Sequence, residues 1–188
     1  MKKTISVLAL LLFVSASSIS PAINNQEQTS ENEPVSLKEI SPFSYCCIPH
    51  KGPFSEIEKI ITQLMKAIQE QNIPPAGAMI GIYYNSPDEV TKAEDLEWEV
   101  GFPVAPQVVV QAPLEKKQWE FTPVASAIHT GPYEETGQTI FKILKWMEDN
   151  KLIQTGPVLE RYLTMPTPET KPEELRTEVW VPCRKGEK

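Results

Sequence analysis

The chain has 188 residues, 40% of them hydrophobic, and it carries 18 Lys and Arg against 25 Asp and Glu, for a net charge of −7. This length allows one domain with a hydrophobic core plus a targeting segment, and nothing in it requires two independently folding domains. The acidic charge makes nucleic acid a poor partner and favours cations, small molecules or other proteins.

Residues 1–22 have the pattern of a secretory signal peptide. Two lysines precede an apolar run over residues 5–14, and small residues follow over 15–20. The run is too short to span a bilayer comfortably, so a permanent anchor is the weaker alternative. Cleavage after Ser18 or Ala22 satisfies the small-residue rule. We therefore expect an exported protein, periplasmic or extracellular, with no membrane span after cleavage and a net charge of −9 once both lysines are removed.

Residues 23–34 are predicted to be a disordered tether, because Asn, Gln, Ser and Glu dominate and apolar residues are nearly absent. The ordered domain is then expected to cover residues 35–184.

The three cysteines do not define a zinc site or a clear disulfide framework. Cys46 and Cys47 are adjacent, and neighbours on a strand point to opposite faces, so at most one of them could pair with Cys183. Buried thiols in core strands are the alternative, and the sequence leaves the choice open.

The predicted domain is an internal duplication. Residues 46–104 align with residues 125–183 without a gap at a constant shift of 79, and sixteen of the 59 pairs are identical. A period this long indicates two copies that pair into one pseudo-symmetric domain, rather than an array of stacked repeats. Such pairing would leave a cleft at the pseudo-twofold axis. The two repeats are expected to cover about 35–104 and about 114–183.

Each copy predicts the same order of strand, helix, strand and strand. The first strand stops at a His-x-Gly-Pro turn, and apolar residues at three- and four-residue spacing then indicate a helix. An extra strand is expected to link the copies, followed by a segment that extends the first strand of the second copy. In chain order the predicted elements are 44–48, 57–68, 79–84, 96–104, 107–111, 114–121, 123–127, 140–147, 158–164 and 175–183.

These elements predict an α+β fold of duplicated β-α-β-β units. The strands should form two small antiparallel sheets or one continuous sheet, with both helices packed on one side and a ligand cleft between the repeats.

The last strand of each copy places a glutamate at an equivalent position, Glu99 and Glu178. If their face lines the cleft, both carboxylates look inward among aromatic rings. An ionised carboxylate beside ring faces attracts a lipophilic cation, whereas a desolvated one can exchange protons near neutral pH. The alternative is that both are solvated on the outer face of the sheet. The candidate ligand-binding residues are Glu178, Glu99, Tyr83, Tyr162, Trp180 and Trp98, of which strand alternation places Trp98 on the face opposite Glu99.

The only two histidines, His50 and His129, occupy equivalent positions just before Gly-Pro. An imidazole there can cap a turn or the start of a helix, and no nucleophile motif such as Gly-x-Ser-x-Gly accompanies it. We expect structural roles for both histidines, with no metal and no cofactor.

Three stretches carry a family resemblance: Ala-Ile-His-Thr-Gly-Pro-Tyr-Glu-Glu at 127–135, Tyr-Leu-Thr-Met-Pro at 162–166 and Glu-Leu-Arg-Thr-Glu-Val-Trp-Val-Pro at 174–182. They resemble the GyrI-like small-molecule-binding domain, which is also the effector-binding module of AraC-type and MerR-type regulators. The resemblance extends over about 35–184. Haem-binding SOUL proteins are somewhat similar in their duplicated architecture, but no strong haem-ligand pattern is present.

The resemblance implies a cleft between the halves, where a glutamate near the end of the domain binds cationic lipophilic compounds among aromatic residues. Glu178 matches that position. Direct transcriptional control and gyrase inhibition are not expected, because the chain has no helix-turn-helix domain and carries a signal peptide. We therefore expect an exported protein that captures a hydrophobic, cationic small molecule.

Two alternatives remain open. Some GyrI-like proteins hydrolyse cyclopropane-bearing toxins with a pocket glutamate, so Glu178 or Glu99 could be catalytic in a hydrolase. The third possibility is a protein-interaction module. The sequence does not fix the ligand or the oligomeric state.

Overall fold

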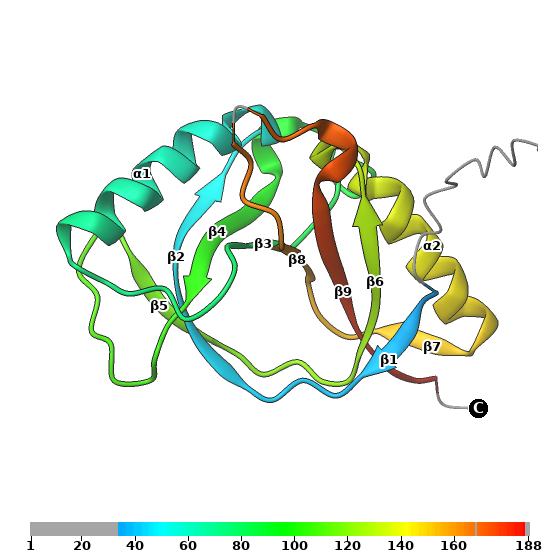
Figure 1. Cartoon of the computed structure of the whole chain (residues 1–188). Coiled ribbons are helices and arrows are strands. Elements are labelled where there is room, and N and C mark those ends of the chain that lie inside the picture. The colour runs from blue at the N-terminus through cyan, green and yellow to red at the C-terminus, as the bar shows by residue number, and fades with distance from the viewer. Residues whose placement is uncertain (1–33, 168, 187–188) are drawn as a thin grey trace, which may run out of the picture.

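The computed structural model describes residues 34–167 and 169–186, in which short strands alternate with two long helices (Figure 1). The predicted signal peptide and almost all of the predicted tether lie outside these residues. The strands are β1 (Ser36–Lys38), β2 (Phe43–Lys51), β3 (Ile80–Tyr83), β4 (Glu97–Pro103), β5 (Glu115–Trp119), β6 (Val124–Thr130), β7 (Leu152–Gln154), β8 (Val158–Tyr162) and β9 (Arg176–Lys185). The helices are α1 (Ile57–Glu70) and α2 (Thr136–Asp149), with short 3-10 helices η1 (Phe54–Glu56), η2 (Ala93–Asp95), η3 (Tyr133–Glu135) and η4 (Pro172–Glu174).

The strands form one antiparallel sheet in the order β1-β6-β9-β8-β3-β4-β2-β5, and β7 pairs with β9 outside this path. Helix α1 lies beside β2 and β4, and α2 lies beside β6 and β9, at opposite ends of the curved sheet (Figure 1). The predicted α+β class is confirmed, and the sheet is continuous.

Both helices pack on the same face of the sheet, as predicted. Buried residues of α1, such as Leu64, share a cluster with Val100 of β4, and those of α2, such as Ile143, share one with Val179 of β9. Val100 and Val179 are equivalent residues of the two copies. Full burial of a Leu or Ile side chain stabilises the fold by about 1.5–3 kcal/mol, so these equivalent contacts hold each helix in place.

A third cluster fills the opposite face of the sheet and contains Tyr45, Trp119 and Trp180. The adjacent cysteines divide between the faces, with Cys46 under α1 and Cys47 in this third cluster. All three cysteines are buried free thiols.

The pseudo-twofold axis passes through the centre of the sheet. Helices α1 and α2 are related by a shift of 79 at both ends. At the centre β3 pairs with β8, and Gly81 lies directly opposite Glu160, its own equivalent 79 residues later. The two copies therefore meet where these equivalent residues face each other.

The two edge strands are exchanged between the copies. Residues 36–38 and 115–117 are also 79 apart, so β1 and the start of β5 are equivalent. Yet β1 pairs with β6 of the second copy, and β5 pairs with β2 of the first. The prediction that residues 114–121 extend the first strand of the second copy is therefore wrong, because this segment completes the other copy.

The predicted strand at 107–111 is also absent from the sheet. Val108 and Val110 lie in a loop and pack against the hydrophobic cluster that contains Leu64 and Val100. The backbone of Gln111 is hydrogen-bonded to the Gln71 side chain at both its N–H and its carbonyl oxygen, each at 2.8 Å. Side-chain hydrogen bonds thus replace a neighbouring strand.

Candidate functional site

Three glutamates, Glu99, Glu160 and Glu178, are almost fully buried, at 1%, 4% and 5% exposed. Burying a carboxylate is costly unless cations or hydrogen-bond donors compensate it. Their partners therefore distinguish structural carboxylates from one that is available to a ligand.

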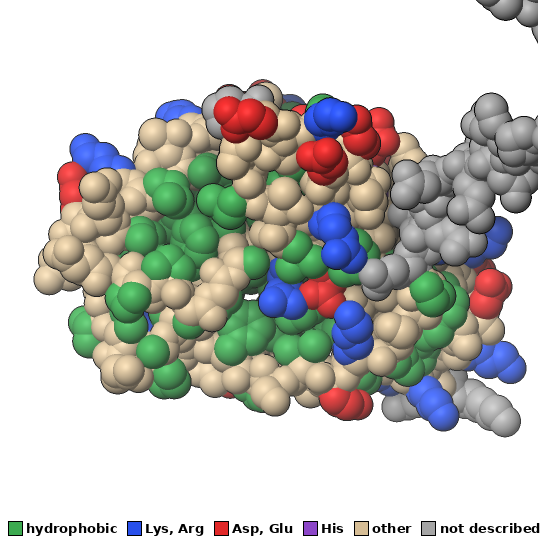
Figure 2. Space-filling view, in the orientation of Figure 1, with side chains coloured by type: hydrophobic (Ala, Val, Ile, Leu, Met, Phe, Trp, Pro, Cys, Tyr) green, Lys and Arg blue, Asp and Glu red, His purple; other side chains and the backbone are tan. Residues whose placement is uncertain are grey.

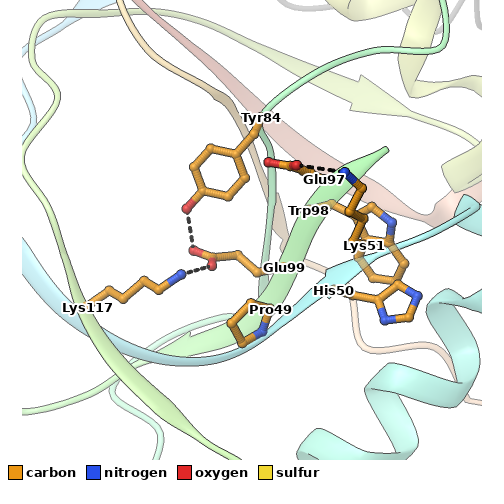
Figure 3. A pocket seen from close by; sticks show the side chains of 8 residues that line it. All are labelled: Pro49, His50, Lys51, Tyr84, Glu97, Trp98, Glu99 and Lys117. Carbon is orange, nitrogen blue, oxygen red and sulfur yellow. Dashed lines mark hydrogen bonds and ion pairs between the residues drawn. The ribbon is translucent and has the colours of Figure 1, made fainter. Parts of the chain in front are cut away.

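Glu99 is fully compensated within the protein (Figure 3). Its Oε1 accepts hydrogen bonds from the hydroxyls of Tyr45 at 2.7 Å and Tyr84 at 2.9 Å, and its Oε2 lies 2.5 Å from Lys117 Nζ. Burial and the Glu99 charge raise the pKa of Tyr84 to about 12. Glu99, Tyr84 and Lys117 border a cavity of about 520 Å³, whose other lining residues are Pro49, His50, Lys51, Glu97 and Trp98. Lys117 pairs with Glu99 and Lys51 lies 3.3 Å from Glu97, so both carboxylates that line this cavity already have a cationic partner.

Glu178 has two cationic partners. Its Oε1 lies 2.6 Å from Lys38 Nζ and its Oε2 lies 2.5 Å from Arg161, and Ser126 donates a further hydrogen bond at 3.2 Å. Burial alone would raise the pKa of the Glu178 carboxyl, but the hydrogen bond and charge of Lys38 and the charge of Arg161 lower it. Figure 2 shows charged side chains of both signs over β8, β9 and β1, with hydrophobic side chains around them. One carboxylate between two cations does not attract a further cation.

The exchanged strands explain two of these ion pairs. Lys38 on β1 and Lys117 on β5 are equivalent residues, as are Glu178 and Glu99. Each lysine reaches the glutamate of the other copy. Both pairs therefore fasten an exchanged strand to the sheet.

The structure does not bring the predicted ligand-binding residues together. In an antiparallel pair, residues directly opposite each other project on the same face. Glu99 is opposite Ile82 on the face away from the helices, whereas Tyr83 is opposite Trp98 on the helix side. The set therefore divides into two groups: Glu99, Glu178 and Trp180 lie on one face, and Tyr83, Tyr162 and Trp98 lie on the other.

The two tyrosines surround Glu160 instead. Its Oε2 accepts hydrogen bonds from Tyr162 at 3.0 Å and Tyr83 at 3.3 Å, and the two hydroxyls are 2.8 Å apart. Thr136, the first residue of α2, also hydrogen-bonds to the carboxylate. Burial raises the pKa of the Glu160 carboxyl, and the three hydroxyl hydrogen bonds offset this only in part. Among the described residues, the hydrogen-bond partners of Glu160 are neutral.

Aromatic rings flank this carboxylate symmetrically. Phe54 meets Tyr83 edge to face with ring centroids 5.4 Å apart, and the equivalent Tyr133 meets Tyr162 at 5.2 Å. Phe54, Tyr83 and Tyr133 are partly buried, whereas Glu160 is 4% exposed. The buried hydroxyl of Thr177, opposite Tyr162 in register, has no hydrogen-bond partner among the described residues. We take Glu160 with these rings as the candidate functional site.

Glu160 was not predicted because the candidate carboxylates, Glu99 and Glu178, are shared by both copies, whereas the equivalent of Glu160 is Gly81. A usable signal was present. Strand alternation places Glu160 on the same face as Tyr162, two residues later.

The histidines have structural contacts, as expected. The two ring nitrogens of His129 lie 3.0 Å from Thr139 Oγ1 and 3.0 Å from the Pro132 carbonyl oxygen, which ties the end of β6 to α2. His50 cannot copy this contact, because Ile60 replaces Thr139 in α1. Its Nε2 instead lies 2.9 Å from Glu56, outside hydrogen-bond geometry, and its ring packs against Trp98.

Residues 34–167 and 169–186 contain neither a cluster of metal-binding side chains nor a helix that could cross a membrane. No group of three or more His, Cys, Asp or Glu residues there is arranged to hold a metal ion. Within the same residues, neither long helix has the length and apolar character needed to cross a membrane.

The chain belongs to the family of GyrI-like small-molecule-binding domains, and the match to this family covers residues 33–184. It is similar to the C-terminal domain of EcmrR, with a TM-score of 0.70 and 19% identity over 81% of this chain and 98% of that domain. In the EcmrR–DNA complex the similarity has a TM-score of 0.71 and 18% identity over 81% of this chain, but the chain spans only 58% of EcmrR.

Two further solved structures share the fold. A hydrolase encoded by lin2189 of Listeria innocua has a TM-score of 0.62 and 15% identity, over 80% of this chain and 91% of that one. SAV2435 bound to tetraphenylphosphonium has a TM-score of 0.54 and 11% identity, over 80% and 94%. No curated protein sequence matches the chain.

Proposed function

We propose that this protein is an exported binding protein that captures a hydrophobic, cationic small molecule at Glu160. Family membership supplies the small-molecule partner. The cationic character of the ligand is proposed from one observation. Glu160 is a buried carboxylate at the pseudo-twofold axis, and its side-chain partners are hydroxyl groups of Tyr83, Tyr162 and Thr136.

A lipophilic cation fits this arrangement for two physical reasons. Its charge compensates the ionised form of Glu160, which burial disfavours in the free protein. Its apolar groups can stack against Phe54, Tyr83 and Tyr133, and a cation over a ring face gains about 0.5–2 kcal/mol. The similar protein SAV2435 bound to tetraphenylphosphonium supports this ligand class.

The other two buried glutamates are weaker candidates for the ligand's charge. Lys117 pairs with Glu99, and Lys38 and Arg161 pair with Glu178. A cation at either position would have to displace a basic side chain.

The test compares three isosteric variants, Glu160→Gln, Glu99→Gln and Glu178→Gln, by calorimetric titration with tetraphenylphosphonium and with neutral triphenylphosphine oxide. Glu160→Gln should lose about 30-fold in affinity for the cation, equivalent to about 2 kcal/mol, because the buried charge pair is lost. Its affinity for the neutral compound should change by less than about twofold. A larger loss of affinity for the cation in either control variant would show that the ligand binds on the other face of the sheet.

A hydrolase is the second candidate function. A carboxyl group with a raised pKa beside two tyrosine hydroxyls can act as a general acid or base, and the similar lin2189 protein is a hydrolase. Mass spectrometry of each ligand after incubation distinguishes the two functions. Intact compound supports binding, whereas a water adduct that disappears in Glu160→Gln supports hydrolysis.

Export is proposed from the pattern of residues 1–22. Expression of the whole chain in a bacterial host should yield a processed protein outside the cytoplasm, with a new N-terminus after Ser18 or Ala22. Intact-mass measurement of the cell fractions checks this, and an unprocessed cytoplasmic protein would contradict it.

A further inference from the structure

Gly81 lies at the centre of the candidate site, directly opposite Glu160. A Cβ atom at Gly81 would come within 2.8 Å of the Tyr162 hydroxyl oxygen and 3.0 Å of the Tyr83 hydroxyl oxygen. The backbone of Gly81 is not in the left-handed region, unlike that of Gly52 and Gly131. Glycine is therefore required at this position because a side chain would not fit, and not because of the backbone conformation.

The two hydroxyl groups use this space to converge on one carboxylate. Tyr83 and Tyr162 are equivalent residues from the two copies, and their oxygens lie 2.8 Å apart over Gly81 while both contact Glu160. A side chain at residue 81 would push at least one hydroxyl away.

We infer that Gly81 is a specificity-determining residue: it keeps the position equivalent to Glu160 empty, so that one carboxylate and two tyrosine hydroxyls form a site for a ligand with a single positive charge. This inference rests on the proposed function. A monocation leaves the site neutral, whereas a dication would bring a second charge into a buried region that holds one carboxylate. A neutral ligand would leave Glu160 without a counter-charge.

Ligand charge is tested with three biaryl compounds of nearly equal shape. They are 4,4'-dimethylbiphenyl with no charge, 1-methyl-4-(4-methylphenyl)pyridinium with one, and 1,1'-dimethyl-4,4'-bipyridinium with two. The monocation should bind at least about 10-fold more tightly than either of the others. Any other order contradicts the inferred charge preference.

The role of Gly81 is tested with Gly81→Ala, and Gly137→Ala is its matched control. Gly137 lies in α2 with nothing within 4 Å of an added Cβ, so its substitution should change affinity for tetraphenylphosphonium by less than about twofold. Gly81→Ala should lower that affinity at least about 10-fold and reduce the preference for the monocation over the neutral biaryl. Unchanged affinity and preference would overturn the role of Gly81.

A second background separates displacement of the hydroxyls from general damage to the fold. Tyr162→Phe removes the hydroxyl nearest to the added Cβ. Placing Gly81→Ala in this background should therefore cost less than about threefold in further affinity. A full 10-fold loss there would contradict the inference. If the wild-type protein binds neither tetraphenylphosphonium nor the monocation, the proposed function itself fails, which differs from binding that ignores residue 81.

Discussion

Glu160 and Glu178 are both buried carboxylates, but their surroundings shift their pKa values in opposite directions. Burial raises the pKa of Glu160, whereas Lys38 and Arg161 lower that of Glu178 below its ordinary value. Because a shifted pKa links folding to pH, the two residues should have opposite effects on stability as pH changes.

For Glu160, the folded protein binds the proton more tightly than the unfolded chain does. This stabilisation is complete below the unfolded-state pKa of about 4.3 and is lost as pH rises through the folded-state pKa. The side chain of Glu160→Gln cannot ionise, so this variant does not lose stability in this way as pH rises. The variant should therefore gain stability relative to wild type as pH rises from about 4 to 8, measured by urea unfolding at each pH. A difference that is independent of pH would contradict the raised pKa.

For Glu178, the sign is reversed. Its contribution to stability is present above the unfolded-state pKa of about 4.3 and is lost as pH falls through the lower folded-state pKa. Glu178→Gln should be less stable than wild type at pH 7, by about 1–3 kcal/mol, and this deficit should shrink in acid. The same urea series measures both variants, and a deficit that grows in acid would rule out the lowered pKa.

At the scale of elements, the exchanged strands β1 and β5 present a natural comparison. Their equivalent lysines make equivalent ion pairs, but Glu178 also has Arg161, whereas Lys117 is the one cationic partner of Glu99 among the residues that the structure describes. Removing the lysine should therefore lower the free energy of unfolding more on β5 than on β1.

Lys117→Met should lower the free energy of unfolding by about 2–3 kcal/mol, because it leaves a carboxylate that is 1% exposed without a cation. Lys38→Met should cost about 1 kcal/mol, since Lys38 is itself 42% exposed on its side chain and Arg161 remains. Denaturant unfolding at pH 7 checks both values. Equal costs would mean that the ion pairs do not fasten the strands as described.

The repeating unit of strand, helix, strand and strand was predictable because its signals are local. Apolar spacing located both helices, although α2 begins at Thr136 rather than at residue 140. Strand exchange was not predictable, since a short sequence such as Ser36–Lys38 does not specify which distant strand it pairs with. The tyrosines of the site were predicted, but their carboxylate was not, because duplication pointed to shared residues and Glu160 is where the copies differ.

At the scale of the whole molecule, neither copy is complete by itself. Each lacks its own edge strand and obtains one from the other copy, and β3 and β8 join the copies at the centre of the sheet. Cutting the chain in the loop at 105–113 would therefore separate β5 from β2 of the first copy and β1 from β6 of the second copy.

Fragments covering residues 34–110 and 112–186 should each fail to show a cooperative thermal transition as monomers, and mixing them should restore one. Circular dichroism with size-exclusion chromatography measures this, with the uncut chain as control. A single fragment that unfolds cooperatively as a monomer would show that the exchange is not required.

The exchange also orders the completion of the two halves during synthesis. The Lys117–Glu99 contact spans 18 residues, so the first copy can close soon after β5 is made. Strand β1 is made first, but its partner strand β6 begins only at Val124, and its Lys38–Glu178 contact spans 140 residues. Contacts between distant residues form slowly, because a long loop must close before they stabilise anything. A nascent chain of this protein therefore keeps β1 unpaired until β6 has been made, and Glu178 can pair with Lys38 only after the C-terminal strand β9 follows.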